Sequence, residues 1–468
     1  MITKTKISFL AIASVLFVSS CKIKDRTYLA SDAVVPATFS GRSDSASMAA
    51  LSYDKFFSDR QLVALLDTAL QNNADVRIAY ERVEAAAAGL LSARGALLPS
   101  FNVQMTGGST RFGNYTMDGM GNATTPGVPF PIINDYFPGV SSSWEADVWG
   151  KLKNKKRASR MRYFATKAGA DLVKTRLISE VAYRYYNLCA LDEELSIIDT
   201  NIRLQTRALE IVKLQKEAGR ATELAVKQCE AQLARTRGME YRVKTDILTA
   251  ENELNFLLGR YSVPVKRSGI KLEQADRITG IGVPAQLLQR RPDVVQAEME
   301  LAASNADVAA ARAAFFPALT ISATAGFNAY HTSVLFDPVS AAYAAMGGLV
   351  APVFNKNLIK AGYNAAKAGN REAFAQYGKT VMNAVYEVST NVGRIANLKA
   401  QYAQNVTAAA ALDEAVAISG DLFIGGYANY LEIITAQRNA IEADLEVVQS
   451  KKNIMIGVVD LYRALGGR

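Results

Sequence analysis

The sequence predicts a mostly α-helical protein with a membrane β-barrel portion, built as an internal two-fold repeat. Three observations support this fold class. Residues 74–103 reappear at 292–321 without a gap. Short segments of strand-like alternation follow both copies, and between them run very long stretches without proline. Repeats of about 200 residues are much longer than solenoid modules, so we expect one pseudo-symmetric body.

The duplication is supported by matched residues at two constant offsets. At an offset of 218, the first set pairs as follows: Asp75, Arg94 and Pro99 with Asp293, Arg312 and Pro317. At an offset of 207, the second set pairs as follows: Gly219, Ala221, Leu224, Ile247, Leu254, Leu258 and Gly259 with Gly426, Ala428, Leu431, Ile454, Leu461, Leu465 and Gly466. Each half therefore contains the same order of helices and strands.

Residues 1–20 have the pattern of a targeting segment. Lys4 and Lys6 precede an apolar run at 7–17, which is too short to cross a bilayer. The run ends in Val18-Ser19-Ser20-Cys21, which resembles the lipobox of bacterial lipoproteins. This resemblance implies cleavage before Cys21, acylation of that cysteine, and an outer-membrane address given Lys22. An ordinary secretory signal with an incidental cysteine is the alternative.

The first half is expected to begin after a lipidated tether at 21–57, which we expect to lie extended on the surface. The first structural repeat spans 58–259. Its helical pattern starts at Ser58-Asp59, a suitable N-cap, breaks at Asn72-Asn73, and ends before Pro99 because the residue before proline avoids the helical conformation.

Four segments alternate in polarity with the period of two that is typical of strands. We expect strands near 100–107 and 136–149 in the first half, and near 318–328 and 341–354 in the second. A loop rich in Gly, Asn, Thr and Pro at 107–135 separates the first two.

Long helical hairpins are predicted after each pair of strands. From 151 to 218 there is no proline and one glycine, Gly169, so a helix there would be on the order of 100 Å long. The chain turns near 219 and returns to 259. A linker at 260–285 leads to the second repeat at 286–468, with its turn near 425. A soluble four-helix bundle is the alternative, but a bundle has no use for the strand pairs.

The four predicted strands imply that several copies of the chain assemble in a membrane. Strands of about 9–11 residues suffice to cross an outer membrane, and a sheet in lipid must close so that every backbone group is paired. Four strands are too few, because the smallest barrels have about eight. Two chains would supply eight and three would supply twelve, and an open lumen favours three. No long apolar run follows the signal segment, so the helices are expected to project into the aqueous compartment.

Cys189 and Cys229 remain beside Cys21. If the chain reverses near Gly219, they lie roughly 30 Å apart along the hairpin, which is beyond the reach of a disulfide. We expect both to be small buried residues.

Several motifs together resemble those of one family across the whole chain. They are Phe56-Phe57-Ser58-Asp59, Asn73-Ala74-Asp75-Val76-Arg77, Ala93-Arg94 leading to Pro99, Trp149-Gly150-Lys151, and Gln289-Arg290-Arg291-Pro292-Asp293-Val294. The chain is similar to the TolC-like outer-membrane factors, in the lipoprotein branch that serves resistance-nodulation-division efflux pumps. The resemblance implies a trimeric tube with a twelve-stranded barrel, four strands per protomer, continuing into a helical α-barrel across the periplasm.

The resemblance also implies where function lies. The hairpin turns would form the entrance and contact a periplasmic adaptor protein, which connects to the inner-membrane transporter. The adaptor-docking residues are Gly219, Arg220, Ala221 and Thr222 in the first turn, and Gly425, Gly426, Ala428 and Asn429 in the second. The gate candidates are Phe423, Asp421, Tyr427 and Glu432.

One gate position departs from the family pattern. Relatives often carry two acidic rings beyond the second turn, but the second position here is Thr435. A three-fold ring of Glu432 would select cations at the mouth. The alternative is that Glu432 is an ordinary solvated residue on the helix surface.

No catalytic constellation is expected. Asp75 and Asp293 begin equivalent helices, so they are expected to interact with the helix N-termini rather than to form a catalytic carboxylate pair. His331 is the single histidine, and no catalytic triad or metal cluster can be assembled around it. We expect no enzyme activity, no metal and no cofactor apart from the lipid on Cys21.

The sequence therefore predicts a passive efflux duct in the outer membrane of a Gram-negative bacterium. The formal charge of +9 falls to +7 without residues 1–20, but a secreted chain does not meet nucleic acid, so no such partner is expected. Two alternatives remain: a type I protein secretion duct of the same fold, and a lipoprotein scaffold of helical rods that forms no pore.

Overall fold

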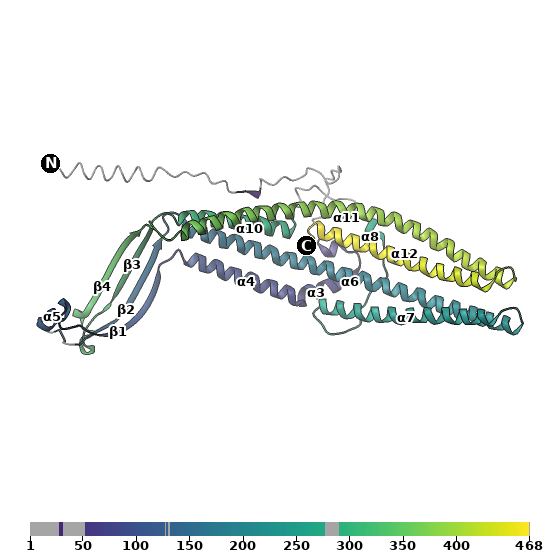
Figure 1. Ribbon diagram of the computed structural model, residues 1–468, viewed down its shortest axis with the longest axis horizontal. Helices are drawn as coiled ribbons and strands as arrows, with labels where there is room; N and C mark the ends of the chain where they lie inside the picture. The colour runs from purple at the N-terminus through teal and green to yellow at the C-terminus, as the bar shows by residue number, and fades with distance from the viewer. Residues whose placement is uncertain (1–27, 31–51, 127, 130–131, 277–289, 468) are drawn as a thin grey trace.

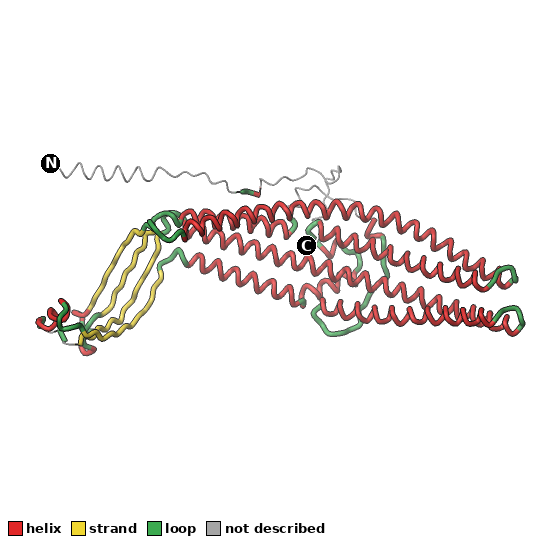
Figure 2. Tube along the Cα trace, viewed as in Figure 1, coloured by secondary structure: helices red, strands yellow, loops and turns green. Residues whose placement is uncertain are grey.

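The chain forms an elongated molecule with a small sheet at one end and long helical hairpins at the other, as Figures 1 and 2 show. This computed structural model describes residues 28–30, 52–126, 128–129, 132–276 and 290–467. The predicted signal segment and the lipidation at Cys21 lie outside the described residues. No helix within the described ranges is both long enough and apolar enough to cross a membrane.

The elements occur in the same order in both halves. The first half contains α2 (Tyr53–Phe56), α3 (Arg60–Asn72), α4 (Ala74–Gly95), β1 (Ser100–Arg111), α5 (Met117–Thr124), β2 (Ile132–Ala146), α6 (Lys151–Glu217) and α7 (Glu223–Leu257). The second contains α10 (Pro292–Ala313), β3 (Ala318–Phe327), η3 (Thr332–Val334), η4 (Pro338–Ser340), β4 (Ala341–Val350), α11 (Leu358–Ile424) and α12 (Tyr430–Ala464). Between them lies the short α8 (Glu273–Asp276).

The lengths of equivalent helices confirm the duplication. Helices α4 and α10 both have 22 residues, α6 and α11 both have 67, and α7 and α12 both have 35. A helix of 67 residues is about 100 Å long at 1.5 Å per residue. Helix α6 contacts α3, α4, α7, α10 and α12. It is therefore the central rod on which both halves of the molecule pack.

The predicted helix starts and breaks are confirmed by capping contacts. The Asp59 carboxylate accepts a hydrogen bond from the Gln61 amide at 2.8 Å and begins α3. The Asn73 side-chain oxygen accepts from the Asp75 amide at 2.8 Å and so begins α4. The Asn73 side-chain Nδ2 also donates to the carbonyl of Leu257 at 2.9 Å, which connects this break to the end of α7.

The largest apolar core lies midway along the rods, where α3 meets α6, α7 and α12. It contains fully buried residues from each of these helices, including Leu66, Tyr185, Leu254 and Val458. The expectation that the whole of 21–57 lies extended on the surface is wrong for its last residues. Residues 53–56 form a helical turn, and Phe56 and Phe57 are buried in this core.

Aromatic contacts explain why the end of that segment is buried. The rings of Phe56 and Phe57 lie 4.7 and 5.3 Å from the ring of Tyr462 in α12. Burial of large aromatic side chains dominates core energetics. Residues near the start of the chain are thereby joined to its last helix.

The four strands form one antiparallel sheet in the order β1-β2-β3-β4. The loop predicted at 107–135 is partly wrong, because β1 continues to Arg111, α5 forms at Met117–Thr124, and β2 starts at Ile132. Gly107 and Gly108 resemble strand breakers in the sequence. In the sheet they pair with Tyr136 and Asp135, and the Tyr136 ring covers Gly107.

Two predicted strands are too long at their C-terminal ends. Strand β2 stops at Ala146 because Asp147 leaves the sheet to cap α6, accepting from the amides of Leu152 at 3.0 Å and Lys153 at 2.7 Å. Strand β4 stops at Val350, before Pro352, which has no amide hydrogen for a strand ladder.

Candidate functional site

The sheet has one apolar face and one polar face. Residues paired across strands lie on the same face, so the register places Val103 beside Val140, Ala325 and Tyr343 in one row. Successive residues point to opposite faces. The apolar face carries Phe101, Val103, Met105, Val140, Ile321, Tyr343 and Leu349, all exposed in the single chain.

The opposite face of the sheet is polar. One row contains Asn102, Ser141 and Thr324, and the next contains Ser143 and Ser322. The outer edges of β1 and β4 pair with no other strand of the described chain. An exposed edge of about ten residues is a template for pairing with another chain. The sheet is therefore amphipathic and open at both edges.

Aromatic side chains join the sheet to the helices. The Trp144 indole N–H donates to the carbonyl of Leu97 at 3.0 Å. The Trp149 indole N–H donates to the carbonyl of Pro317 at 2.8 Å, and its ring stacks on Phe316 with centroids 4.9 Å apart. These contacts hold both indole rings at the junction between the sheet and the helices.

Each hairpin turn at the far end is built by one glycine in a left-handed conformation. Gly219 has a φ of +72°, and its amide donates to the carbonyl of Lys216 at 2.9 Å. The next amide, of Arg220, donates to the carbonyl of Gln215 at 2.8 Å. These two bonds form the Schellman motif that ends a helix. The Thr222 hydroxyl then accepts from the amide of Ala225 at 3.3 Å and starts the return helix.

The second turn repeats this geometry 207 residues later. Gly426 has a φ of +79°, and its amide donates to the carbonyl of Phe423 at 3.1 Å. The Tyr427 amide donates to the carbonyl of Leu422 at 2.8 Å. The Asn429 side chain caps α12 by accepting from the amide of Leu431 at 2.8 Å. The residues predicted as docking turns thus form two equivalent loops at one end of the molecule (Figure 1).

The two turns differ in their side chains. Around the first, Lys216 pairs with Glu223, and Lys213 pairs with Glu230 at 3.3 Å, so ion pairs connect α6 to α7. Around the second, the exposed side chains include Ile424, Tyr427 and Leu431. Leu224 at the first turn is exposed like its equivalent Leu431 at the second, so the first turn differs by its ion pairs between α6 and α7.

The predicted gate residues do not form one cluster in the single chain. Asp421, Tyr427 and Glu432 are exposed, and the Asn429 side-chain Nδ2 donates to the Glu432 carboxylate at 3.3 Å. Phe423 is half-buried and packs against the apolar cluster of the first hairpin, which includes Leu209 and Val226. Phe423 thus joins the two hairpins.

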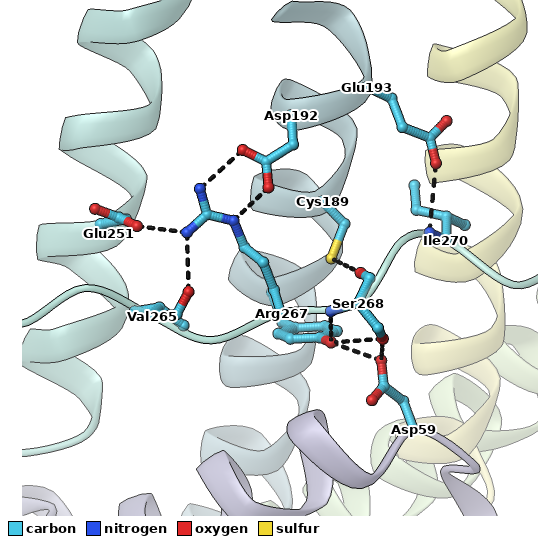
Figure 3. Close-up of polar contacts among 10 residues, drawn as sticks. Asp59, Cys189, Asp192, Glu193, Glu251, Val265, Arg267, Ser268 and Ile270 are labelled. Atoms are coloured by element: carbon cyan, nitrogen blue, oxygen red, sulfur yellow. Dashed lines mark hydrogen bonds and ion pairs between the residues drawn. The ribbon is translucent and has the colours of Figure 1, made fainter. Parts of the chain in front are cut away.

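A polar belt that the sequence reasoning missed holds the linker against the rods, as Figure 3 shows. Arg267 forms ion pairs with Asp192 of α6 and Glu251 of α7. The hydrogen bond to Asp192 raises the pKa of Arg267, against the opposing effect of desolvation. In the sequence, Arg267 lies in a segment rich in glycine and proline, without a motif that marks it. Its role in holding the linker becomes visible only in the fold, where it lies between α6 and α7.

The same belt connects the linker to the start of α3. The Tyr185 hydroxyl donates to the Asp59 carboxylate at 2.6 Å, and the Ser268 backbone amide donates to the Tyr185 oxygen at 3.0 Å. The Cys189 thiol donates to the Ser268 carbonyl at 2.9 Å, and burial raises the pKa of this thiol to about 12. The belt therefore keeps the Cys189 side chain buried and in its protonated thiol form.

The remaining polar candidates do not converge on a reaction centre. Both remaining cysteines are buried and free of disulfide, as predicted. Asp293 lies in the first turn of α10 and pairs with Arg291 at 2.7 Å, and Asp75 lies in the first turn of α4. His331 is exposed beside the end of β3. Among the residues described, no three His, Cys, Asp or Glu side chains are grouped to hold a metal ion.

Comparison with known proteins agrees with this geometry. A family model described as outer membrane efflux protein matches residues 65–260 and 283–467. The chain is 27% identical to the probable outer membrane lipoprotein SilC of Salmonella typhimurium over 99% of each chain. It is 28% identical to the cation efflux system protein CusC of Escherichia coli O157:H7, over 88% of this chain and 87% of the relative.

Solved structures share the fold along most of the chain. A structure of CusC has a TM-score of 0.84 at 25% identity and covers 96% of this chain and 100% of its own. The outer-membrane channel OprN has a TM-score of 0.85 at 24% identity, with coverage of 96% and 99%. A membrane protein from Pseudomonas aeruginosa has a TM-score of 0.83 at 26% identity, with coverage of 95% and 97%.

Proposed function

The chain belongs to the outer membrane efflux protein family, and we propose that three copies of it form the exit duct of a tripartite efflux pump. Its relatives are outer-membrane components of efflux systems, among them CusC and the toluene efflux pump protein TtgI of Pseudomonas putida. The protein is accordingly an outer-membrane efflux channel. The trimer, the gate and the docking surfaces are proposals of our own.

The amphipathic, open-edged sheet carries the proposal. Exposed side chains such as Val103 and Tyr343 on one face suit contact with lipid, and Asn102 and Thr324 on the other suit a water-filled lumen. Backbone groups at the edges of β1 and β4 cannot stay unpaired in hydrocarbon. Three copies supply twelve strands, which is enough to close a barrel with an open lumen.

The helical end supplies the contact with the pump. The turns around Gly219 and Gly426 lie at the end of the molecule opposite the sheet (Figure 1), so in the outer membrane they point into the periplasm. We assign them as the surface that a periplasmic adaptor contacts. An inner-membrane transporter of the resistance-nodulation-division class would supply the energy, and conduction through the duct would be passive. Acylation of Cys21 would anchor the mature chain.

The entrance is proposed to be lined by the second hairpin. Glu432 is exposed in the first turn of α12, and three copies around a narrow mouth would concentrate negative charge and select cations. Thr435 replaces a second acidic position, so a single ring would act alone. Asp421 and Tyr427 are exposed beside it, while Phe423 links the two hairpins.

Single-channel conductance in planar bilayers, together with the oligomer mass in detergent, tests the proposal. A trimer with a cation-selective conductance is expected, and Glu432→Ala should lower the selectivity. Glu442→Ala changes an exposed glutamate three turns further along α12 and serves as the matched control. A monomer without conductance would overturn the duct. A conducting trimer whose cation selectivity does not change in the Glu432→Ala variant would overturn only the assignment of the gate.

A further inference from the structure

A cavity of about 150 Å³ lies between the two hairpins near their turns. All four long helices line it. Ile211 comes from α6, Cys229 from α7, Phe423 from α11 and Ile434 from α12. Its walls are mostly apolar, and the nearby cluster of Leu209, Val212 and Val226 closes the first hairpin behind it.

One buried amide in this cavity lacks a partner. Gln205 of α6 lines the cavity and is only 4% exposed. Neither its side-chain oxygen nor its side-chain nitrogen has a hydrogen-bond partner within the described part of the chain. Buried polar atoms are nearly always hydrogen-bonded in folded proteins, so each exception requires an explanation. Here one donor and one acceptor are unpaired in the same place.

The other polar residues around the cavity strengthen this observation. Gln232 and Gln437 add two more amides to the lining, and Gln437 is buried. Arg207 also lines the cavity but is exposed, so the buried polar groups of the lining are the amides of Gln205 and Gln437, and the Gln205 amide is the unpaired one. The chain thus places uncharged hydrogen-bonding groups inside an apolar wall.

The chemistry of the wall indicates what would fit. Apolar cavities of about 150 Å³ are large enough for a single aromatic ring. Water would satisfy the amide but would gain nothing from the apolar side chains around it. A charged ligand would lose its hydration without an opposite charge buried beside it. The best complement is a neutral ring-sized molecule with one group that donates and accepts hydrogen bonds.

We propose that the cavity between the hairpins is a binding site for small neutral amphipathic molecules, held by the Gln205 amide. A primary amide matches Gln205 in both directions, because its N–H donates to Oε1 and its oxygen accepts from Nε2. Sites that combine an apolar lining with a few placed polar groups are typical of small-molecule pockets. The site does not depend on whether the protein conducts.

Binding of benzamide to the full chain purified in detergent tests the proposal. Isothermal titration at millimolar benzamide measures the dissociation constant, and toluene serves as the apolar probe of the same size. Gln205→Leu removes the amide and keeps an apolar wall, and Gln228→Leu makes the same change at an exposed position on α7. We expect Gln205→Leu to weaken benzamide binding about ten-fold or more and to strengthen toluene binding. Gln228→Leu should change neither.

A second variant fills the space instead of changing its polarity. Ala208→Leu adds bulk to the α6 wall, so it should weaken both benzamide and toluene. Absence of benzamide binding to the wild-type chain would overturn the proposal. So would binding that Gln205→Leu and Ala208→Leu both leave unchanged, because the molecule would then lie elsewhere.

Discussion

Gly219 and Gly426 occupy equivalent left-handed positions at the two hairpin turns, with φ values of +72° and +79°. A Cβ atom added at either position would meet no atom within 4 Å. The requirement for glycine there is therefore one of backbone conformation and not of space. Both halves of the duplication therefore use a left-handed glycine to end the long helix and reverse the chain direction.

The first prediction concerns these turns. Gly219→Ala and Gly426→Ala are each expected to destabilise the protein by about 1 kcal/mol, because an L-residue is strained in the left-handed region. Gly238→Ala is the control, since Gly238 lies within α7 with open space around it. It should stabilise α7 by about 0.5–1 kcal/mol. Thermal unfolding midpoints compare the three, and equal shifts would contradict the account.

The second prediction concerns the belt. Arg267→Met should destabilise the protein by about 2 kcal/mol, because it leaves the carboxylates of Asp192 and Glu251 without their cation. Arg184→Met breaks a pair with Glu253 in which both side chains are nearly half-exposed, so its cost should stay below about 1 kcal/mol. Denaturant unfolding of the two variants measures the difference. A smaller effect at Arg267 than at Arg184 would contradict a structural role for the belt.

The third prediction concerns pH. Burial, and secondly the charge of Asp413, raise the pKa of Asp444 above the ordinary aspartate value. The folded state then binds this proton more tightly than the unfolded state, so stability falls as pH rises through the folded pKa. Asp444→Asn should therefore stabilise the protein at pH 7 and lose this advantage below about pH 4.

Thermal melts between about pH 3 and pH 7 check this expectation. Asp413→Asn removes only the second cause, so it should act in the same direction with a smaller effect. An Asp444→Asn variant that is less stable than wild type at pH 7 would show that the carboxylate has a favourable partner instead.

Much of the fold could be predicted because it depends on local signals. The breaks at Asn72-Asn73 and at Gly219 follow from capping and left-handed glycine, which the sequence displays directly. The alternation of polar and apolar residues at 318–328 and 341–354 predicts two strands, and both form as β3 and β4. The identical lengths of α6 and α11 follow from the constant offset of 207.

Other features depend on contacts between distant segments and so left no local signal. Gly107 stays in β1 because Tyr136 pairs with it across the sheet. Asp147 leaves β2 because it caps α6. The family resemblance gave Phe423 as a gate candidate, but the sequence did not show that it packs on the first hairpin. The Arg267 belt joins Tyr185 to Asp59, which lies 126 positions away.

The final prediction uses neighbouring positions on β3 to test the duct itself. Ser322 belongs to the polar face of the sheet and Ala323 to the apolar face. If three sheets close around a lumen, a cysteine at 322 lines the water-filled path and one at 323 faces lipid. The native Cys189 and Cys229 are buried, and burial raises the pKa of both thiols, so their reactive thiolate forms are suppressed.

The measurement is single-channel conductance of Ser322→Cys and Ala323→Cys before and after addition of a water-soluble cationic thiosulfonate. The account predicts that the reagent lowers the conductance of Ser322→Cys and leaves that of Ala323→Cys unchanged. An unaffected Ser322→Cys channel, or an equal loss in both variants, would contradict a lumen lined by the polar face of the sheet.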